Sequence, residues 1–381
     1  MSRLKTYPLL PFSRLVYDMT RWMPSVYRFS YELCRKGGAK DKQVVEEALR
    51  QAIANHPAFS MHIDWLGQHY PTTLRDNLHG RYHDFRIYTK GDDLYVRASI
   101  SRILGDGKSG EIFIDDLVRA LQGERIETDD YWGYLEYMEQ QKQSKHYAES
   151  KAWLESEFSD QSIPIRPTLD RHLWTLLPPK AGLYETDYSD LHDKINQLAE
   201  TEFLSLDGFF SLCAGLAIAE YCNTDAAALT WAYEGREREE EQRIFGSLHR
   251  DVPFAIKVNG RMDEWRKEEL IRMARNEIRS GISHSDYPYT LTAPYDRRWN
   301  YAANVLRITD IEDIAQKNPI HFDILPQPAP KIAYALLDIE IHEKPEQLQL
   351  CFRYSATHYK PESIRRFAVL VRKHAEWLVE E

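Results

Sequence analysis

The residues with the clearest chemical pattern lie between Ser99 and Ser109, in the order Ser-Ile-Ser-Arg-Ile-Leu-Gly-Asp-Gly-Lys-Ser. An alternating apolar run ends in this segment, and a helical pattern begins at Gly107. Asp106 stands where a carboxylate caps the first free N–H groups of a helix, and Gly107 suits a turn that requires a positive φ. Taken alone, this pattern predicts a strand–turn–helix junction and no particular activity.

A second dense run extends from Trp231 to Gly246 and contains a Gly-Arg pair followed by alternating charges. An apolar strand pattern leads into Gly235-Arg236, and a new strand pattern follows Phe245-Gly246. Runs of mixed charge usually form a solvated loop or helix face. We therefore expect a connecting loop here, and the charges alone predict no catalytic group.

The elements that must position these residues alternate between strands and helices in both halves of the chain. In the first half, the patterns predict a strand at 26–35, a helix at 42–56, a hairpin of 85–89 with 94–100 and a helix at 107–121. In the second half, they predict a helix capped by Asp207 and ending at Cys222, strands at 228–233 and 252–258, a charged surface helix at 261–282, a hairpin of 336–341 with 347–354 and a last helix opened by Pro361. This mixture indicates an α/β protein.

The length of 381 residues allows two modest lobes, each with its own core. The segment Asp160–Pro179 contains several prolines and shows little periodicity, which is typical of a passage between lobes. We therefore expect an N-terminal lobe at 1–165 and a C-terminal lobe at 166–381.

Composition excludes several classes of protein. The net charge of −10 argues against a nucleic-acid binder, which needs a basic surface. The N-terminal apolar run is broken by Pro11 and Arg14, and the most apolar stretch, Phe209–Cys222, is too short to span a bilayer. The four cysteines show no zinc-binding spacing and no disulfide framework. We expect a cytoplasmic protein without a metal or redox cofactor and without membrane insertion.

In their order along the chain, these segments resemble the condensation domains of nonribosomal peptide synthetases, in the superfamily of chloramphenicol acetyltransferase. Six motifs spread over nearly the whole chain carry the resemblance, and none is decisive alone. They are Tyr7–Tyr17, similar to the opening motif; Asn55–Ser60, similar to RHPxLR; Ser101–Gly107, on the active-site motif HHxxxDG; Leu206–Cys222, on the apolar helix; Gly235–Phe254, similar to GR…VGxFxNTLPL; and Leu348–Leu378, on the closing strand and helix.

The resemblance implies two chloramphenicol acetyltransferase-like α/β sandwich lobes in a V-shaped arrangement with a channel between them. It implies Ser101, Arg102, Asp106, Gly107 and Ser109 at that channel. The implied reaction moves an acyl group from a carrier-protein or CoA thioester to an amine or alcohol. The implied partners are a carrier protein or other synthetase domains, and a phosphopantetheine or CoA thioester would be the substrate.

The active-site motif departs from the family pattern at its histidines. The second histidine, which works beside the nascent bond in the family, is replaced by Arg102, and the first by Ser101. A guanidinium stays protonated and cannot accept a proton. No histidine in the chain is followed four positions later by Asp, so no shifted motif exists. The Asn-Thr pair of the family becomes Arg250-Asp251, and Ser60 replaces an arginine that is one candidate partner for Asp106.

Two hypotheses about function therefore stay open. In the first, the chain is a condensation-like binding or recruiting module without amide-forming activity, in which Arg102 offers a cation to a carboxylate or phosphate. In the second, it is an active acyltransferase that relies on proximity or on another base, for which His249 is the nearest candidate by motif. A further local hypothesis pairs Arg102 with Asp106 across the turn. An unrelated soluble α/β protein is the third alternative.

Overall fold

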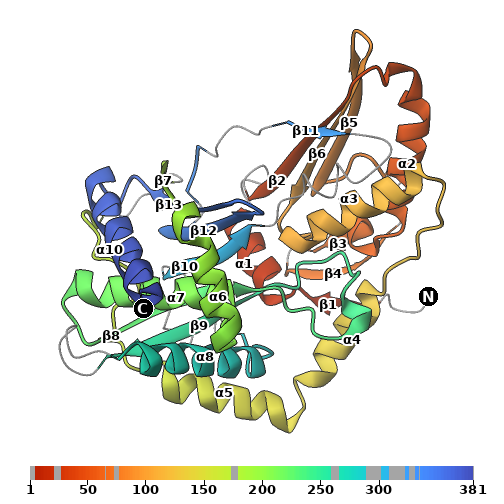
Figure 1. The fold of residues 1–381 in the computed structure, drawn as a ribbon. Helices are drawn as coiled ribbons and strands as arrows, with labels where there is room; N and C mark the ends of the chain where they lie inside the picture. Colours follow the sequence, from red (N-terminus) through yellow and green to blue (C-terminus); the bar gives the residue numbers. More distant parts are fainter. Residues whose placement is uncertain are drawn as a thin grey trace. The chain divides into compact units, whose positions relative to one another are not determined.

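The structure, a computed structural model, describes residues 5–20, 27–64, 66–72, 77–172, 179–258, 266–288, 302–308, 322–325, 331–333 and 335–380. The chain forms two compact units and alternates between them (Figure 1). Unit 1 contains Met1–Lys142, Glu234–His249 and Thr309–Ala329, whereas unit 2 contains Gln143–Tyr233, Arg250–Ile308 and Pro330–Glu381.

This division differs from the contiguous lobes expected at 1–165 and 166–381. Helix α5 (Lys145–Glu157) belongs to unit 2, where Leu154 joins a small apolar cluster with Ala228. Two segments from the second half of the chain belong to unit 1. Periodicity shows where a helix or strand lies but not which sheet buries it, so the sequence alone could not assign these segments.

Unit 1 is built on an antiparallel sheet in the order β11-β2-β6-β5. The central strands are β2 (Arg28–Arg35) and β6 (Asp93–Ser101), and β5 (His83–Lys90) forms the expected hairpin with β6. The hairpin turn contains Gly91 at a φ of 60°, a conformation that glycine adopts without strain. The edge strand β11 (Asp323–Ile324) comes from a later part of the chain. A smaller sheet has the order β1-β4-β3, with β1 (Tyr7–Pro8), β4 (Gln68–Pro71) and β3 (Met61–Ile63).

The helices of unit 1 cover one apolar face of its main sheet. Helix α2 (Lys42–Ala54) and helix α3 (Gly107–Leu121) pack against each other, and α1 (Pro11–Thr20) and α4 (Tyr131–Gln141) complete the unit. The core beneath them includes Leu49, Phe85, Val96, Phe113 and Phe245, all at most 1% exposed. The last of these comes from the segment 234–249, so that segment is part of the core of unit 1.

Unit 2 contains a mixed sheet in the order β7-β13-β12-β10-β8-β9. Strand β10 runs parallel to both of its neighbours, and the other pairs are antiparallel. The strands are β7 (Ala181–Asp187), β13 (Gln347–Ser355), β12 (Leu337–Lys344), β10 (Ala303–Ile308), β8 (Ala226–Tyr233) and β9 (Arg250–Lys257). The predicted hairpin near the C-terminus is confirmed as β12 and β13.

The helices of unit 2 pack around one almost wholly apolar helix. This is α7 (Leu206–Cys222), in which thirteen residues are buried, and it contacts α6 (His192–Glu202), α8 (Lys267–Ser283) and α10 (Pro361–Val379). A helix that is apolar on all sides belongs inside a protein. Figure 1 shows α6, α7, α8 and α10 gathered on unit 2.

The predicted N-cap of the apolar helix is wrong. The N-cap of α7 is Ser205, whose side chain accepts a hydrogen bond from the N–H of Gly208, so Asp207 lies in the first turn instead. Both residue types can cap a helix, and the local pattern does not decide which of them takes the extended conformation that a cap requires. The predicted surface helix α8 also buries a stripe that includes Leu270, Ala274 and Ile278, and its expected start at 261–265 lies outside the described residues.

Among the described helices, none is by itself both long and apolar enough to cross a bilayer. The helical segments Ser189–Glu202 and Leu206–Cys222 meet that criterion only as a pair, and they are bent by 104° relative to each other. The four cysteines are free thiols, and three of them are buried.

Candidate functional site

The turn that follows β6 places the candidate site in unit 1. Strand pairing extends to the end of β6, where Ser101 lies opposite Arg28 in the register with β2. The next N–H, of Arg102, donates to the carbonyl of Tyr27 over 2.9 Å. The side chain of Ser101 is buried, and its hydroxyl accepts from the N–H of Ile103 at 3.3 Å. The turn is therefore held by backbone contacts on both sides.

Asp106 caps helix α3, as the sequence predicted. The expected positive φ at Gly107 is wrong, because Gly107 is the first residue of the helix and has helical backbone geometry. The Oδ1 of Asp106 accepts from the N–H of Ser109 at 2.9 Å, and the N–H of Asp106 donates to Ser109 Oγ at 3.2 Å, which completes a capping box. Ser109 Oγ also lies 2.7 Å from the carbonyl oxygen of Gly246 and accepts from the Gly246 N–H at 3.1 Å. The serine hydroxyl therefore binds the segment 234–249 and is not free to act as a nucleophile.

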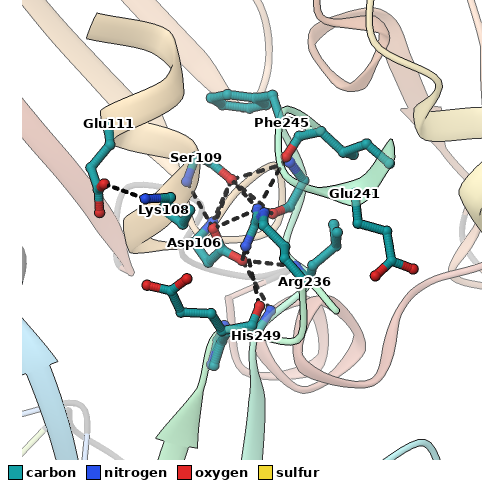
Figure 2. Close-up of polar contacts among 12 residues, drawn as sticks. Asp106, Lys108, Ser109, Glu111, Arg236, Glu241, Phe245 and His249 are labelled. Atoms are coloured by element: carbon teal, nitrogen blue, oxygen red, sulfur yellow. Dashed lines mark hydrogen bonds and ion pairs between the residues drawn. The ribbon is translucent and has the colours of Figure 1, made fainter. Parts of the chain in front are cut away.

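The ion-pair partner of Asp106 is Arg236. The guanidinium donates to both carboxylate oxygens, over 2.9 Å to Oδ2 and 3.1 Å to Oδ1, and both side chains are at most 2% exposed (Figure 2). The second guanidinium nitrogen also donates to the carbonyl oxygens of Ile244 and Gly246, at 3.1 Å each. Planar, two-point pairing of this kind is the strongest geometry for an arginine and a carboxylate.

The carboxylate of Asp106 also accepts hydrogen bonds from the backbone. Asp106 Oδ2 accepts from the N–H groups of Leu248 and His249, both at 2.9 Å. Burial alone would raise the pKa of Asp106, but the charge and hydrogen bonds of Arg236 outweigh it and lower the pKa to about 2. Asp106 is thus an ionised structural centre that fixes both the start of α3 and the segment 234–249.

The expected pairing of Arg102 with Asp106 is wrong, because Asp106 turns into the core as the cap of α3 and meets Arg236 there. No ion pair joins Arg102 to any described residue. Its side chain is half-buried near Tyr31, where burial raises the pKa of the tyrosine to about 12 and the charge of Arg102 opposes that rise. The sequence analysis singled out Arg236 in its Gly-Arg pair, but no local pattern indicated which acidic residue would form an ion pair with it.

The start of helix α3 has an open side. Gly107 is exposed, and a Cβ atom placed on it would have no atom within 4 Å outside its own helix and immediate neighbours. Beside it, Lys108 Nζ forms an ion pair with Glu111 Oε2 at 2.7 Å (Figure 2). The N–H end of a helix attracts negative charge, and at this end the ionised carboxylate of Asp106 already provides one.

The other predicted site residues fall into two groups. Gly235, at a φ of 66°, and Gly246 lie with Arg236 in the segment that unit 1 binds. His249 ends that segment, and its half-buried ring packs edge-on against Phe12, with 3.9 Å between ring centroids. Arg250 and Asp251 lie in β9 of unit 2, where Arg250 donates to Ser285 Oγ at 2.8 Å. Within the described residues, no group of three or more His, Cys, Asp or Glu side chains is arranged to hold a metal ion.

We predict that replacing Asp106 with Ala lowers the free energy of unfolding by about 3–5 kcal/mol, because it leaves the guanidinium of Arg236 buried without a counter-charge. Denaturant unfolding followed by circular dichroism measures the change. Glu139→Ala breaks an exposed ion pair with Lys142 and should cost less than about 1 kcal/mol. Equal losses in the two variants would contradict the structural role of Asp106.

We also predict a characteristic acid dependence. Because the folded-state pKa of Asp106 is depressed to about 2, its contribution to stability is complete above the unfolded-state pKa of about 3.9. That contribution is lost as the pH falls through the folded value. Unfolding free energies of the parent and of Asp106→Asn, measured from about pH 5 down to about pH 2, should converge as the pH falls. A constant difference between them would show that Asp106 is not ionised in the fold.

Solved structures of the same fold include several domains of peptide-synthesis enzymes. The epimerization domain from the third module of tyrocidine synthetase B is 15% identical, with a TM-score of 0.78 over 99% of this chain and 97% of that chain. The X-domain from teicoplanin biosynthesis is 13% identical, with a TM-score of 0.79 over 100% and 95% of the two chains. The starter condensation domain of rhizomide synthetase, solved with C8-CoA, is 15% identical, with a TM-score of 0.76 over 98% and 95%.

These similarities show the fold, so the expectation of two chloramphenicol acetyltransferase-like α/β units is confirmed. A search of curated proteins gave no match. The sequence model of the condensation domain matches residues 84–381, which is well over half of the chain. This range contains the capped turn at Asp106, its partner Arg236 and the whole of the sheet in unit 2. The chain therefore belongs to the condensation domain family.

Proposed function

We propose that this chain is a cytoplasmic binding or recruiting module of the condensation domain family that has lost histidine-dependent amide formation. The observation that carries the proposal is a contrast within one motif. The buried Asp106–Arg236 ion pair is present and both carboxylate oxygens are hydrogen-bonded, whereas the two histidine positions of the family hold Ser101 and Arg102. A fold that retains the scaffold of a site without its proton acceptor is suited to binding rather than to general base catalysis.

The groups nearest the lost histidines cannot replace them. The hydroxyl of Ser101 is buried and bound to the turn, and that of Ser109 is bound to Gly246. Arg102 is a permanent cation and has no lone pair to accept a proton. The turn itself therefore supplies charge and shape but no general base.

The ligand that fits this edge of unit 1 is an anion. Arg102 has no ion-pair partner among the described residues, and the open start of α3 at Gly107 lies five positions further along the chain. A guanidinium together with the N–H end of a helix suits a phosphate or carboxylate. We propose the phosphate of a phosphopantetheine or CoA thioester as that anion, held as a ligand rather than as a cofactor.

The partner we propose is a carrier protein or another protein of the same synthetase. Support comes from the X-domain of teicoplanin biosynthesis, which has been solved in complex with OxyB and is 14% identical to this chain, with a TM-score of 0.79 over 100% of this chain and 94% of that chain. A domain of this fold can therefore present a surface to a second protein. For the present chain, recruitment would not require the missing histidine.

An active acyltransferase with a different base is the second candidate function, and the position of His249 favours it. Its backbone N–H donates to Asp106 Oδ2 at 2.9 Å, so the residue lies beside the motif. A base at this position would take the proton of an amine or alcohol as that group attacks the thioester carbonyl.

We predict that the chain forms no amide above the uncatalysed rate when it is mixed with an acyl N-acetylcysteamine thioester and a primary amine. Product formation is measured by mass spectrometry, and the parent is compared with His249→Ala. Turnover in the parent that disappears in His249→Ala would overturn the binding-module proposal in favour of the second candidate.

We predict in addition that Arg102→Ala weakens the binding of CoA by about tenfold or more, because it removes a charged hydrogen-bond donor of about 1.5–3 kcal/mol. Isothermal titration calorimetry measures the affinity. Arg97→Ala removes an exposed cation from β6, the strand that ends just before Arg102, and should leave the affinity within about twofold of the parent. An equal effect of both substitutions would show only a general charge effect and would remove Arg102 from the site.

A further inference from the structure

A second buried charge cluster holds the segment 234–249, and it is centred on His56. This histidine follows α2 and precedes the short helical turn Pro57–Ser60, and it is 1% exposed. Its Nδ1 lies 2.7 Å from Asp129 Oδ2, and its Nε2 lies 3.3 Å from Asp116 Oδ2. Both carboxylate side chains are only 3% exposed. The imidazole is thus placed between two buried carboxylates.

This geometry favours the protonated form of the ring. A neutral imidazole donates from one nitrogen and presents a lone pair on the other. If His56 were neutral and donated from Nδ1 to Asp129, the lone pair of Nε2 would lie 3.3 Å from an oxygen of Asp116 in a buried site. The contact of Nε2 with Asp116 is an ion-pair contact and not a hydrogen bond, and the positive charge of the imidazolium partly balances both acids.

The same two acids bind the segment 234–249. The N–H of Phe245 donates to Asp129 Oδ2 at 3.1 Å, and Arg243 forms ion pairs with Asp116 and, at 2.8 Å, with Asp115. The ring of Phe245 packs with its centroid 5.2 Å from that of His56. The cation, the two acids and the segment therefore form one connected contact.

Every element around His56 contributes to its environment. Helix α3 supplies Asp116, with Asp115 beside it, and Arg119 pairs with Asp116 at 3.2 Å and with Glu124 at 3.0 Å. The segment before α4 supplies Asp129, whose other oxygen accepts from the N–H of Tyr131 at 3.1 Å. The remaining neighbours are the apolar rings of Phe59, Phe113 and Phe245.

We propose that the imidazolium of His56 is a pH-sensitive lock that fastens the segment 234–249 onto unit 1. Loss of its proton leaves Asp116 and Asp129 buried around a neutral ring, so the closed arrangement becomes less stable relative to one in which water reaches the two acids. The segment also supplies Arg236 and Gly246 to the site at Asp106. Opening of the lock would therefore loosen that site in alkaline conditions, whichever ligand the site binds.

The direction of the pH dependence follows from the charges. Burial disfavours the charged ring, but the contacts with Asp116 and Asp129 outweigh burial and raise the pKa of His56 above its ordinary value of 6.5. A raised folded-state pKa gives stabilisation that is complete below the unfolded-state value. It is lost as the pH rises through the folded-state value. The lock is therefore closed in mildly acidic solution and opens above about pH 6.5.

Hydrogen–deuterium exchange of the full chain, read by mass spectrometry, tests the proposal. After correction for intrinsic exchange, the opening equilibrium of peptides covering 243–249 should rise by up to about tenfold per pH unit above about pH 6.5, then level off. Peptides from β12 should show no such rise. In His56→Gln, the 243–249 peptides should exchange rapidly at every pH.

The matched control is His83→Gln. This histidine is also 1% exposed, but burial lowers its pKa to about 4, and its Nε2 lies 3.0 Å from the carbonyl oxygen of Asn77. Its variant should keep the pH profile of the parent. A flat profile in the parent, or an unchanged profile in His56→Gln, would overturn the proposal.

A second measurement on the unmodified chain decides the matter if His56→Gln does not fold. Nuclear magnetic resonance of ring-labelled histidine, with the His56 signal followed through the titration, should show His56 protonated on both nitrogens near pH 6.5. A neutral His56 ring at that pH would exclude the lock.

Discussion

The buried pair of Asp106 and Arg236 is the interaction on which the architecture of unit 1 depends. The two residues are 130 positions apart and come from different parts of the chain, yet both side chains are shielded from water. A buried charge without its partner costs several kcal/mol. The chain can therefore place Asp106 at the cap of α3 only if the segment 234–249 returns to meet it. The positions of Ser109, Gly246 and the N–H groups of Leu248 and His249 follow from this requirement.

Within this one motif, the residue that holds the fold together, Asp106, is distinct from the positions that would carry out proton transfer, which hold Ser101 and Arg102. Asp106 uses its carboxylate oxygens on α3, Arg236 and the backbone, so its role does not depend on the residues that precede it. The positions of Ser101 and Arg102 lie before the cap and can change without breaking it. For this reason a condensation-family fold can persist while the residues that would handle protons are replaced.

A second cluster of charged residues, at His56, also holds the segment 234–249, but its balance of positive and negative charge is of a different kind. At Asp106 one permanent cation meets one acid, and the pair stays ionised over a wide range of pH. At His56 a titratable cation meets two acids, so the balance depends on a proton. The connection at Asp106 is thus insensitive to changes of pH near neutrality, whereas we expect the connection at His56 to respond to them.

The sequence by itself determined the elements and the family. Alternation and helical spacing predicted β2, the β5–β6 hairpin and the β12–β13 hairpin, and they gave α3 its bounds, because these patterns depend on residues close in the chain. Six ordered motifs predicted the condensation-domain fold. Only the tertiary structure decided that Arg236 rather than Arg102 pairs with Asp106, that α5 belongs to unit 2, and that His56 lies between Asp116 and Asp129. Each of these depends on contacts between residues far apart in the chain, which local periodicity does not encode.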